Sequence, residues 1–420
     1  MPLRLVLAAA LTALAAGPST AQEPAGLAIE VGAAWAGRVA VGRTGEIVVR
    51  VTSTAGGLVR LSLPDAKPLV TKTVRVAANV PATAAIALRV GADPAVRVRA
   101  IREDGIAAET TARPFLPVES ERPVAAAVSD PAAMRLPAGM QRLNVAPEAL
   151  PRTPQAYDAV LAVVVDGAAL ARLDAGQRAA LALHLADCGR VVATRLPAEA
   201  RTELRALAGC GGAFLATPEP DDDLAATVAP LLAARLPPVA DPGAAPRDDL
   251  VPFALLAFLG AYLALIAAAM AMPRAWPLFA IPAVAAALAV AVGYEQPPRI
   301  VLAVEAQAEP GAATARYRAR ATITGAGRAE SRVAVPAFAR LIGIPHSGAI
   351  ELDDSSPWAT VVLPGGLGRR DELRWDGPAT LPAGLARAPG REPLSAEAAS
   401  LLVRGGNVQG WWRLRAADWP

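Results

Sequence analysis

The chain has 420 residues, of which 54% are hydrophobic, and a mean hydropathy of +0.35. This is more apolar than an ordinary soluble protein of this size and too polar for a transporter with many membrane spans. The net charge is only +3 and no basic run occurs, which argues against a nucleic-acid-binding protein.

Residues 1–21 have the pattern of a signal peptide. Arg4 supplies a short positive region, an apolar stretch follows over 5–16, and Ser19-Thr20-Ala21 has the small-x-small form that precedes a cleavage site. An uncleaved anchor is the alternative, but the apolar stretch is too short to span a bilayer comfortably. We therefore expect export across the inner membrane of a bacterium.

Residues 25–118 contain short segments in which apolar and polar residues alternate. The clearest lie at 46–52, 58–63, 71–76, 84–90 and 95–101, separated by turns rich in Gly, Pro and Asn. This spacing is typical of a small antiparallel β-sandwich. Such domains usually bind other proteins or act as spacers, and this segment shows no catalytic constellation.

Residues 122–235 change to an alternation of strands and helices. We expect strands at 124–128, 157–165, 190–194 and 212–216, and helices at 175–187, 197–208 and 224–236. Strands that alternate with helices indicate a parallel sheet covered on both faces, as in flavodoxin-like α/β domains.

Three stretches of this domain carry a recognisable pattern: Tyr157-Asp158-Ala159-Val160-Leu161, then Leu173-Asp174-Ala175-Gly176-Gln177-Arg178-Ala179-Ala180-Leu181, then Cys188-Gly189-Arg190-Val191-Val192. Together they resemble class I glutamine amidotransferase-like domains of bacterial membrane proteins. Cys188 departs from the pattern because it replaces a Gly. Members built from a sandwich, such a domain and membrane helices are generally of unknown function. The resemblance implies partners such as von Willebrand A-domain membrane proteins.

The catalytic constellation of that family is missing from this sequence. Active members place a Cys on a sharp strand-to-helix turn and pair it with His and Glu, because the thiolate must be activated by a base. The corresponding turn here is Arg195-Leu196-Pro197, without a Cys. His184 lies within a predicted helix, and His346 lies in the last domain. We therefore expect a catalytically inactive domain, and we assign no catalytic, cofactor-binding or metal-binding residue.

The two cysteines, Cys188 and Cys210, each lie between a predicted helix and the following strand. A metal site needs more ligands, and a redox site would favour a closer spacing. If the strands that follow are neighbours, their entry points lie about 4.8 Å apart, within disulfide range. A disulfide is our hypothesis. Two free thiols are the alternative, and a strand inserted between the two would forbid the bond.

Two long apolar segments without charged residues follow a linker at 236–249. Residues 250–272 and 275–294 are each long enough to cross a membrane, and only Met272-Pro273-Arg274 separates them. The sequence thus predicts a two-helix transmembrane hairpin, with a pair of buried core helices as the alternative. Since neither segment carries an ionisable residue, the hairpin is expected to be an anchor and not a transport path.

Residues 299–420 return to alternating segments, so we expect a β-rich domain in the periplasm. The pattern is clear at 299–307, 315–324, 332–335, 349–352 and 359–363. Near the end, Trp411-Trp412-Arg413 fits a closing strand, with contact to lipid headgroups as the alternative.

The expected fold is therefore multidomain: a β-sandwich, an α/β domain, a transmembrane hairpin and a β-rich domain. The expected function is a membrane-anchored periplasmic scaffold or protein-interaction module, with membrane lipid and envelope proteins as partners and no nucleic acid. A hydrolase or amidase with an unrecognised site, and an accessory subunit of a transport or envelope complex, are the alternatives. A hydrolase would need a cleft with perturbed titratable groups.

Overall fold

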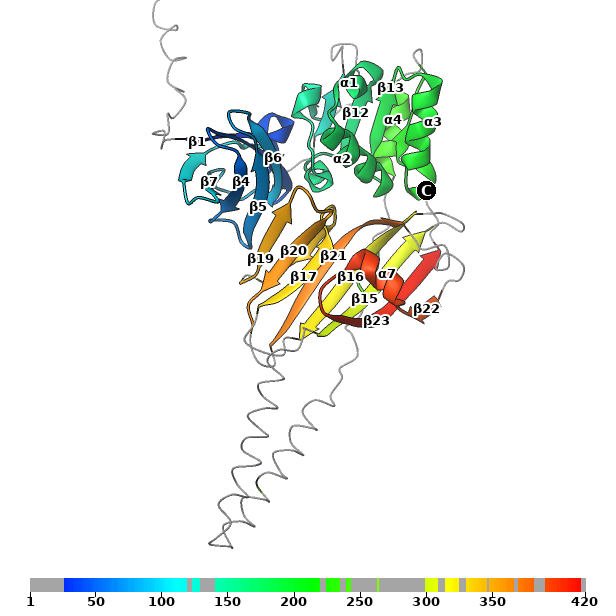
Figure 1. Cartoon of the computed structure of the whole chain (residues 1–420). Coiled ribbons are helices and arrows are strands. Elements are labelled where there is room, and N and C mark those ends of the chain that lie inside the picture. Colours follow the sequence, from blue (N-terminus) through cyan, green and yellow to red (C-terminus); the bar gives the residue numbers. More distant parts are fainter. Residues whose placement is uncertain are drawn as a thin grey trace, which may run out of the picture.

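The computed structural model describes twelve stretches of the chain: residues 26–118, 123–128, 140–219, 224–234, 239–242, 263, 299–308, 314–324, 330–345, 347–365, 369–380 and 390–416. Of these residues, 49% lie in strands and 22% in helices. Figure 1 shows an N-terminal β domain and an α/β domain side by side, both next to a C-terminal β domain.

The N-terminal domain is a two-layer β structure. Its strands are β1 (Leu27–Ala33), β2 (Arg38–Ala40), β3 (Thr44–Ser53), β4 (Gly57–Leu63), β5 (Leu69–Val76), β6 (Ala82–Arg89), β7 (Val96–Arg102), β8 (Ala107–Ala112) and β9 (Leu116–Val118), with the 3-10 helix η1 (Ala34–Gly37). One sheet has the order β1-β3-β6, and β5-β4-β7-β8 form part of the other. Alternate residues of β3, namely Ile47, Val49 and Val51, are fully buried, as period-two patterning requires.

The α/β domain contains a five-stranded parallel sheet in the order β11-β10-β12-β13-β14. The strands are β10 (Val124–Ala127), β11 (Arg142–Asn144), β12 (Ala162–Asp166), β13 (Val191–Thr194) and β14 (Leu215–Ala216). The helices are α1 (Gly167–Arg172), α2 (Ala175–Ala186), α3 (Ala198–Leu207) and α4 (Leu224–Ala233), with 3-10 helices η3 (Pro147–Ala149), η4 (Pro154–Ala159) and η5 (Cys210–Gly212). Apolar clusters occupy both faces of the sheet: Leu181 packs on one side and Val228 on the other.

Two predicted strands of this domain start too early. Residues 157–159, expected in a strand, belong to η4, which Pro154 initiates at its first position, where a residue without an N–H fits best. Residues 212–214 also lie outside a strand, because η5 occupies 210–212 and β14 begins only at Leu215.

The C-terminal domain adds a six-stranded sheet in the order β18-β21-β16-β15-β23-β22. Its elements are β15 (Arg299–Ala308), β16 (Thr314–Thr324), β17 (Ser331–Pro336), β18 (Arg340–Gly343), β19 (Ala349–Asp353), β20 (Trp358–Leu363), β21 (Arg370–Thr380), β22 (Gly390–Pro393), α7 (Ala396–Leu402) and β23 (Asn407–Ala416). Trp412 lies within β23 and is 3% exposed, so it belongs to the core.

One sheet is shared by the first and last domains. β19 pairs in parallel with β5, which gives the seven-stranded order β17-β20-β19-β5-β4-β7-β8. The side-chain hydroxyl of Thr71 donates to the carbonyl oxygen of Ile350 at 3.4 Å, across 279 residues of sequence. The two β domains are therefore joined by backbone pairing, which the sequence did not indicate.

The predicted fold class must be corrected in its transmembrane hairpin. Among the residues that the structure describes, no helix is long and apolar enough to cross a membrane. The longest helix described, α2, has 12 residues and is about 18 Å long, against a hydrocarbon core of about 30 Å. The described chain is instead mostly β-sheet. The signal peptide and, apart from Leu263, the proposed spans at 250–272 and 275–294 lie outside the described residues.

Candidate functional site

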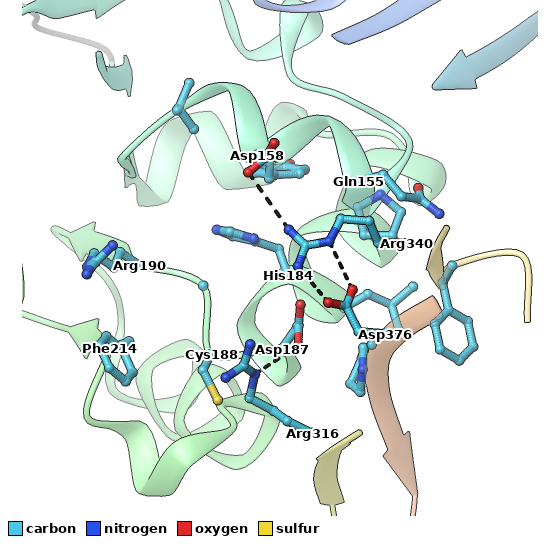
Figure 2. Close-up of a pocket in the computed structure, with 18 of the residues that line it drawn as sticks. Gln155, Asp158, His184, Asp187, Cys188, Arg190, Phe214, Arg316, Arg340 and Asp376 are labelled. Atoms are coloured by element: carbon cyan, nitrogen blue, oxygen red, sulfur yellow. Dashed lines mark hydrogen bonds and ion pairs between the residues drawn. The ribbon is translucent and has the colours of Figure 1, made fainter. Parts of the chain in front are cut away.

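A cleft of about 170 Å³ lies between the α/β domain and the six-stranded sheet. One wall comes from η4 and the end of α2, and the other comes from β16, β18 and β21. Figure 2 shows that charged side chains from the two walls point toward one another across this cleft.

The end of α2 is shaped by a tight C-terminal turn. The N–H of Cys188 donates to the carbonyl of Leu185 at 3.0 Å, and the N–H of Gly189 donates to that of His184 at 2.7 Å. These two bonds make a Schellman motif, in which Cys188 takes the left-handed conformation, with φ 61°, that Gly usually occupies. The turn places His184 and Asp187 along the cleft.

His184 is held as a neutral ring at the back of the cleft. It stacks on Tyr157 with ring centroids 4.7 Å apart, and Tyr157 meets Trp35 edge-on at 5.3 Å. A Cβ on Gly189 would lie 2.2 Å from the imidazole, so only glycine fits there. Burial lowers the pKa of His184 to about 4, so the ring carries no charge at neutral pH.

Cys188 and Cys210 form a disulfide with Cα atoms 5.6 Å apart. The strands that follow them, β13 and β14, are neighbours in the parallel sheet. The N–H of Gly209 also donates to the carbonyl of Leu185, which brings the chain before η5 against the end of α2. The bond therefore fixes the turn that carries Asp187.

Among the described residues, three Arg–Asp pairs join the α/β domain to the six-stranded sheet. Arg316 of β16 donates to Asp187 at 3.2 Å, Arg340 of β18 lies 3.9 Å from Asp158, and Arg374 of β21 lies 3.4 Å from Asp241. In each pair the C-terminal domain supplies the cation and the α/β domain, or the segment after α4, supplies the carboxylate. We call these three pairs the interdomain latch.

Asp187 differs from an ordinary surface carboxylate. Burial raises its pKa, and the nearby Arg316 only partly offsets this effect. About a third of its side-chain surface remains accessible, within the cleft. The ionised form is therefore stabilised mainly by Arg316 and to a smaller extent by Arg340.

The latch continues into a row of alternating charges across the sheet. Arg340 donates two hydrogen bonds to Asp376, at 2.9 and 2.7 Å. These bonds raise the pKa of the Arg340 guanidinium. Asp376 lies opposite Arg318, which lies opposite Glu305. Glu305 in turn lies opposite Arg413, and their charged atoms are 3.4 Å apart. The row therefore spans five strands from β18 to β23.

The N-terminal domain contacts the α/β domain at the start of η4. The carboxylate of Glu46, fully buried on β3, accepts from the backbone N–H groups of Arg152 and Thr153 and from the Thr153 hydroxyl. Burial raises the pKa of this carboxyl group. Arg43 also lies 3.7 Å from Asp158, so this aspartate touches cations of two domains.

The chemistry of the cleft is that of charge pairing. Both thiols are consumed in the disulfide, and His184 is stacked with a depressed pKa. Within the described residues no group of His, Cys, Asp and Glu side chains is arranged to hold a metal ion. Asp187, with its raised pKa, is the group in the cleft best suited to exchange a proton.

Sequence reasoning found part of this site. It singled out Cys188, Cys210 and His184, and Cys188 and His184 line the cleft. It missed Arg316 and Arg340, which are ordinary charged residues in strands. One available signal was the repeat of Arg at 316, 318 and 320, which puts three cations on one face of a strand. His346 lies outside the described residues.

Comparisons with known proteins give no family for this chain. No family model matches it. No curated protein matches it either. Among solved structures, it is similar to a cycloisomaltooligosaccharide glucanotransferase of Paenibacillus sp. in complex with cycloisomaltoheptaose, with 12% identity and a TM-score of 0.17. The match covers 40% of this chain and 27% of that one, and is too weak to carry an argument. The amidotransferase-like resemblance therefore stays a prediction.

Proposed function

We propose that this chain is a non-enzymatic scaffold, which holds three domains in one fixed arrangement so that their surfaces bind protein partners together. The observation that carries the proposal is the interdomain latch, in which arginines of one domain each meet a carboxylate of another. The sheet shared through β5 and β19 adds a second connection of a different kind.

The three pairs of the latch differ in how much each is expected to stabilise the contact between the domains. Arg374 and Asp241 are both well exposed, and such pairs contribute about 0–1 kcal/mol. Arg316 is only 13% exposed, so its attraction to Asp187 is screened less by water than that of the exposed pair. We therefore expect the Arg316–Asp187 pair to contribute most to holding the domains together.

The disulfide supports a location outside the cytoplasm for this scaffold. Cys188 and Cys210 are bonded at the edge of the cleft, and structural disulfides persist in oxidising compartments. This agrees with the export signal expected at residues 1–21, which stays a prediction.

The experiment compares cross-linked partners of three full-length versions in the native cell, quantified by mass spectrometry. The wild type is compared with Arg316→Ala/Arg340→Ala, which opens the latch, and with Arg50→Ala. Arg50 forms an exposed pair with Glu30 inside the N-terminal domain and serves as the matched control. Circular dichroism verifies that each version is folded.

A scaffold predicts that the latch variant loses its wild-type partners while the Arg50 control keeps them. Partners retained in full by a folded latch variant would contradict the proposal. So would hydrolysis of amide or ester substrates by the purified chain, if the activity disappears in Asp187→Asn.

A further inference from the structure

A second and larger cavity, of about 1,010 Å³, lies between the N-terminal domain and β18. Its lining includes β6 and the chain after it, the β4–β5 connection, η4, and residues 337 and 339–344. We call it the edge groove. Its lining differs from that of the cleft, although Gln155, Asp158 and Arg340 line both.

The groove runs along the edges of two strands. Successive residues of a strand point to opposite faces, so a cavity over one face touches every second residue. Here all residues of 339–344 line the groove, and so do all residues of 87–91. β18 is the terminal strand of the six-stranded sheet and β6 is the terminal strand of its three-stranded sheet. Within the described chain, the groove is thus bordered by two sheet edges.

A β-bulge presents one apolar side chain along this edge. In the pairing of β18 with β21, Leu341 faces Trp375 and Gly343 faces Arg374, while Ile342 has no opposite residue. Ile342 is 49% exposed and lines the groove. Bulges at sheet edges commonly redirect a side chain in this way.

The groove also contains an unused hydrogen-bond acceptor. The side-chain amide nitrogen of Gln155 donates to the carbonyl oxygens of Ala337 and Ala339 at 2.8 and 3.1 Å, which fixes the amide just before β18. Its Oε1 atom is buried and accepts from no described group. A ligand with backbone N–H groups would satisfy this oxygen.

The charge of the lining favours an acidic ligand. Seven Lys and Arg side chains line the groove against five Asp. Arg89 donates its Nε to the carbonyl of Gly42. Lys67 is exposed and forms no ion pair with a described residue. The other five lining cations form ion pairs with carboxylates, so Lys67 and Arg89 are the positive charges available to a ligand.

We propose that the edge groove binds an extended peptide segment that carries carboxylates, which adds to the sheet as a strand beside β18. Main-chain hydrogen bonds to the strand edge would supply affinity, and Lys67 with its neighbours would select the acidic side chains. This inference rests on the proposed function, because it names the class of partner that the scaffold holds.

The test uses the full chain and three fluorescein-labelled octapeptides, measured by fluorescence anisotropy. The first peptide alternates Val with Glu, the second alternates Val with Lys, and the third is the Val–Glu peptide with every second backbone amide methylated. A photo-crosslinking version of the first peptide maps its position. The protein variants are Lys67→Glu and, as the control outside the groove, Arg50→Glu.

We expect the Val–Glu peptide to bind and to cross-link to residues 339–344. We expect binding to weaken about tenfold or more in Lys67→Glu, on methylation, and for the Val–Lys peptide, but not in Arg50→Glu. Absence of Val–Glu binding would overturn the inference, as would binding insensitive to methylation or to Lys67→Glu. If the Val–Glu peptide does not bind but cross-linked partners are still lost in the latch variant, the groove inference is wrong and the scaffold proposal is still supported.

Discussion

At the scale of single residues, the site is defined by groups whose ionisation the fold has changed. Burial raises the pKa values of Glu46 and Asp187 and lowers that of His184. All three lie at the junction of domains, where charged groups lose water when the domains meet. Their titration therefore reports on the closed arrangement.

His184 gives the most specific pH prediction. Its pKa is about 4 in the folded chain and 6.5 when unperturbed, so the unfolded state binds a proton first. The stabilisation is complete above pH 6.5 and is lost as the pH falls toward 4, by up to about 3 kcal/mol. Urea unfolding at pH 7.5 and pH 4.5 should show this loss in the wild type and not in His184→Phe, which keeps a stacking ring.

Glu46 and Asp187 contribute to the pH dependence of stability with the opposite sign. Their contribution cancels when the wild type is compared with His184→Phe. Their raised pKa values favour the folded state at low pH, and this stabilisation is lost as the pH rises through their folded values. His346→Phe, which changes the other histidine, is the matched control and should keep the wild-type acid sensitivity. An equal loss in wild type and His184→Phe would refute the assignment.

At the scale of elements, the end of α2 carries a residue that its conformation does not favour. Cys188 adopts a left-handed conformation, which costs a residue with a side chain roughly 1–2 kcal/mol. The disulfide to Cys210 explains why glycine is absent there. Closing a loop of this size contributes on the order of 3 kcal/mol in the chain-entropy model, which exceeds that cost.

Two double variants separate these contributions. Cys188→Ser/Cys210→Ser should lose about 3 kcal/mol of unfolding free energy. Cys188→Gly/Cys210→Ser should recover about 1 kcal/mol of it, because glycine adopts the turn without strain. Denaturant unfolding of the full chain measures both. A glycine variant no more stable than the serine variant would show that the turn conformation carries no cost.

Elements with local patterning could be predicted from the sequence. The alternation at 46–52 lies inside β3, and the predicted helix at 175–187 matches α2, which an Asp174–Gln177 capping box begins. The strand expected over 157–165 was wrong in its first part, because an apolar run of that length does not distinguish a strand from a buried turn of helix. Tyr157 is buried by Trp35, a contact that no local pattern contains.

At the scale of the whole molecule, the decisive features join distant parts of the sequence. The pairing of β5 with β19, the latch, and the charge row from Arg340 to Arg413 all depend on tertiary register. A single sequence gives the residue types of these contacts but not their partners. This explains why the cysteines were recognisable in advance while Arg316 and Arg340 were not.

If charge pairs across the cleft hold the domains in one arrangement, the distance between the α/β and C-terminal domains must be narrowly distributed. Spin labels at exposed Arg178 on α2 and Leu401 on α7 report the separation of the α/β and C-terminal domains by pulsed electron resonance. We expect one narrow distribution in the wild type and in Arg50→Ala, and a broad one in folded Arg316→Ala/Arg340→Ala. An unchanged narrow distribution in the folded latch variant, or a broad one in the wild type, would contradict this expectation.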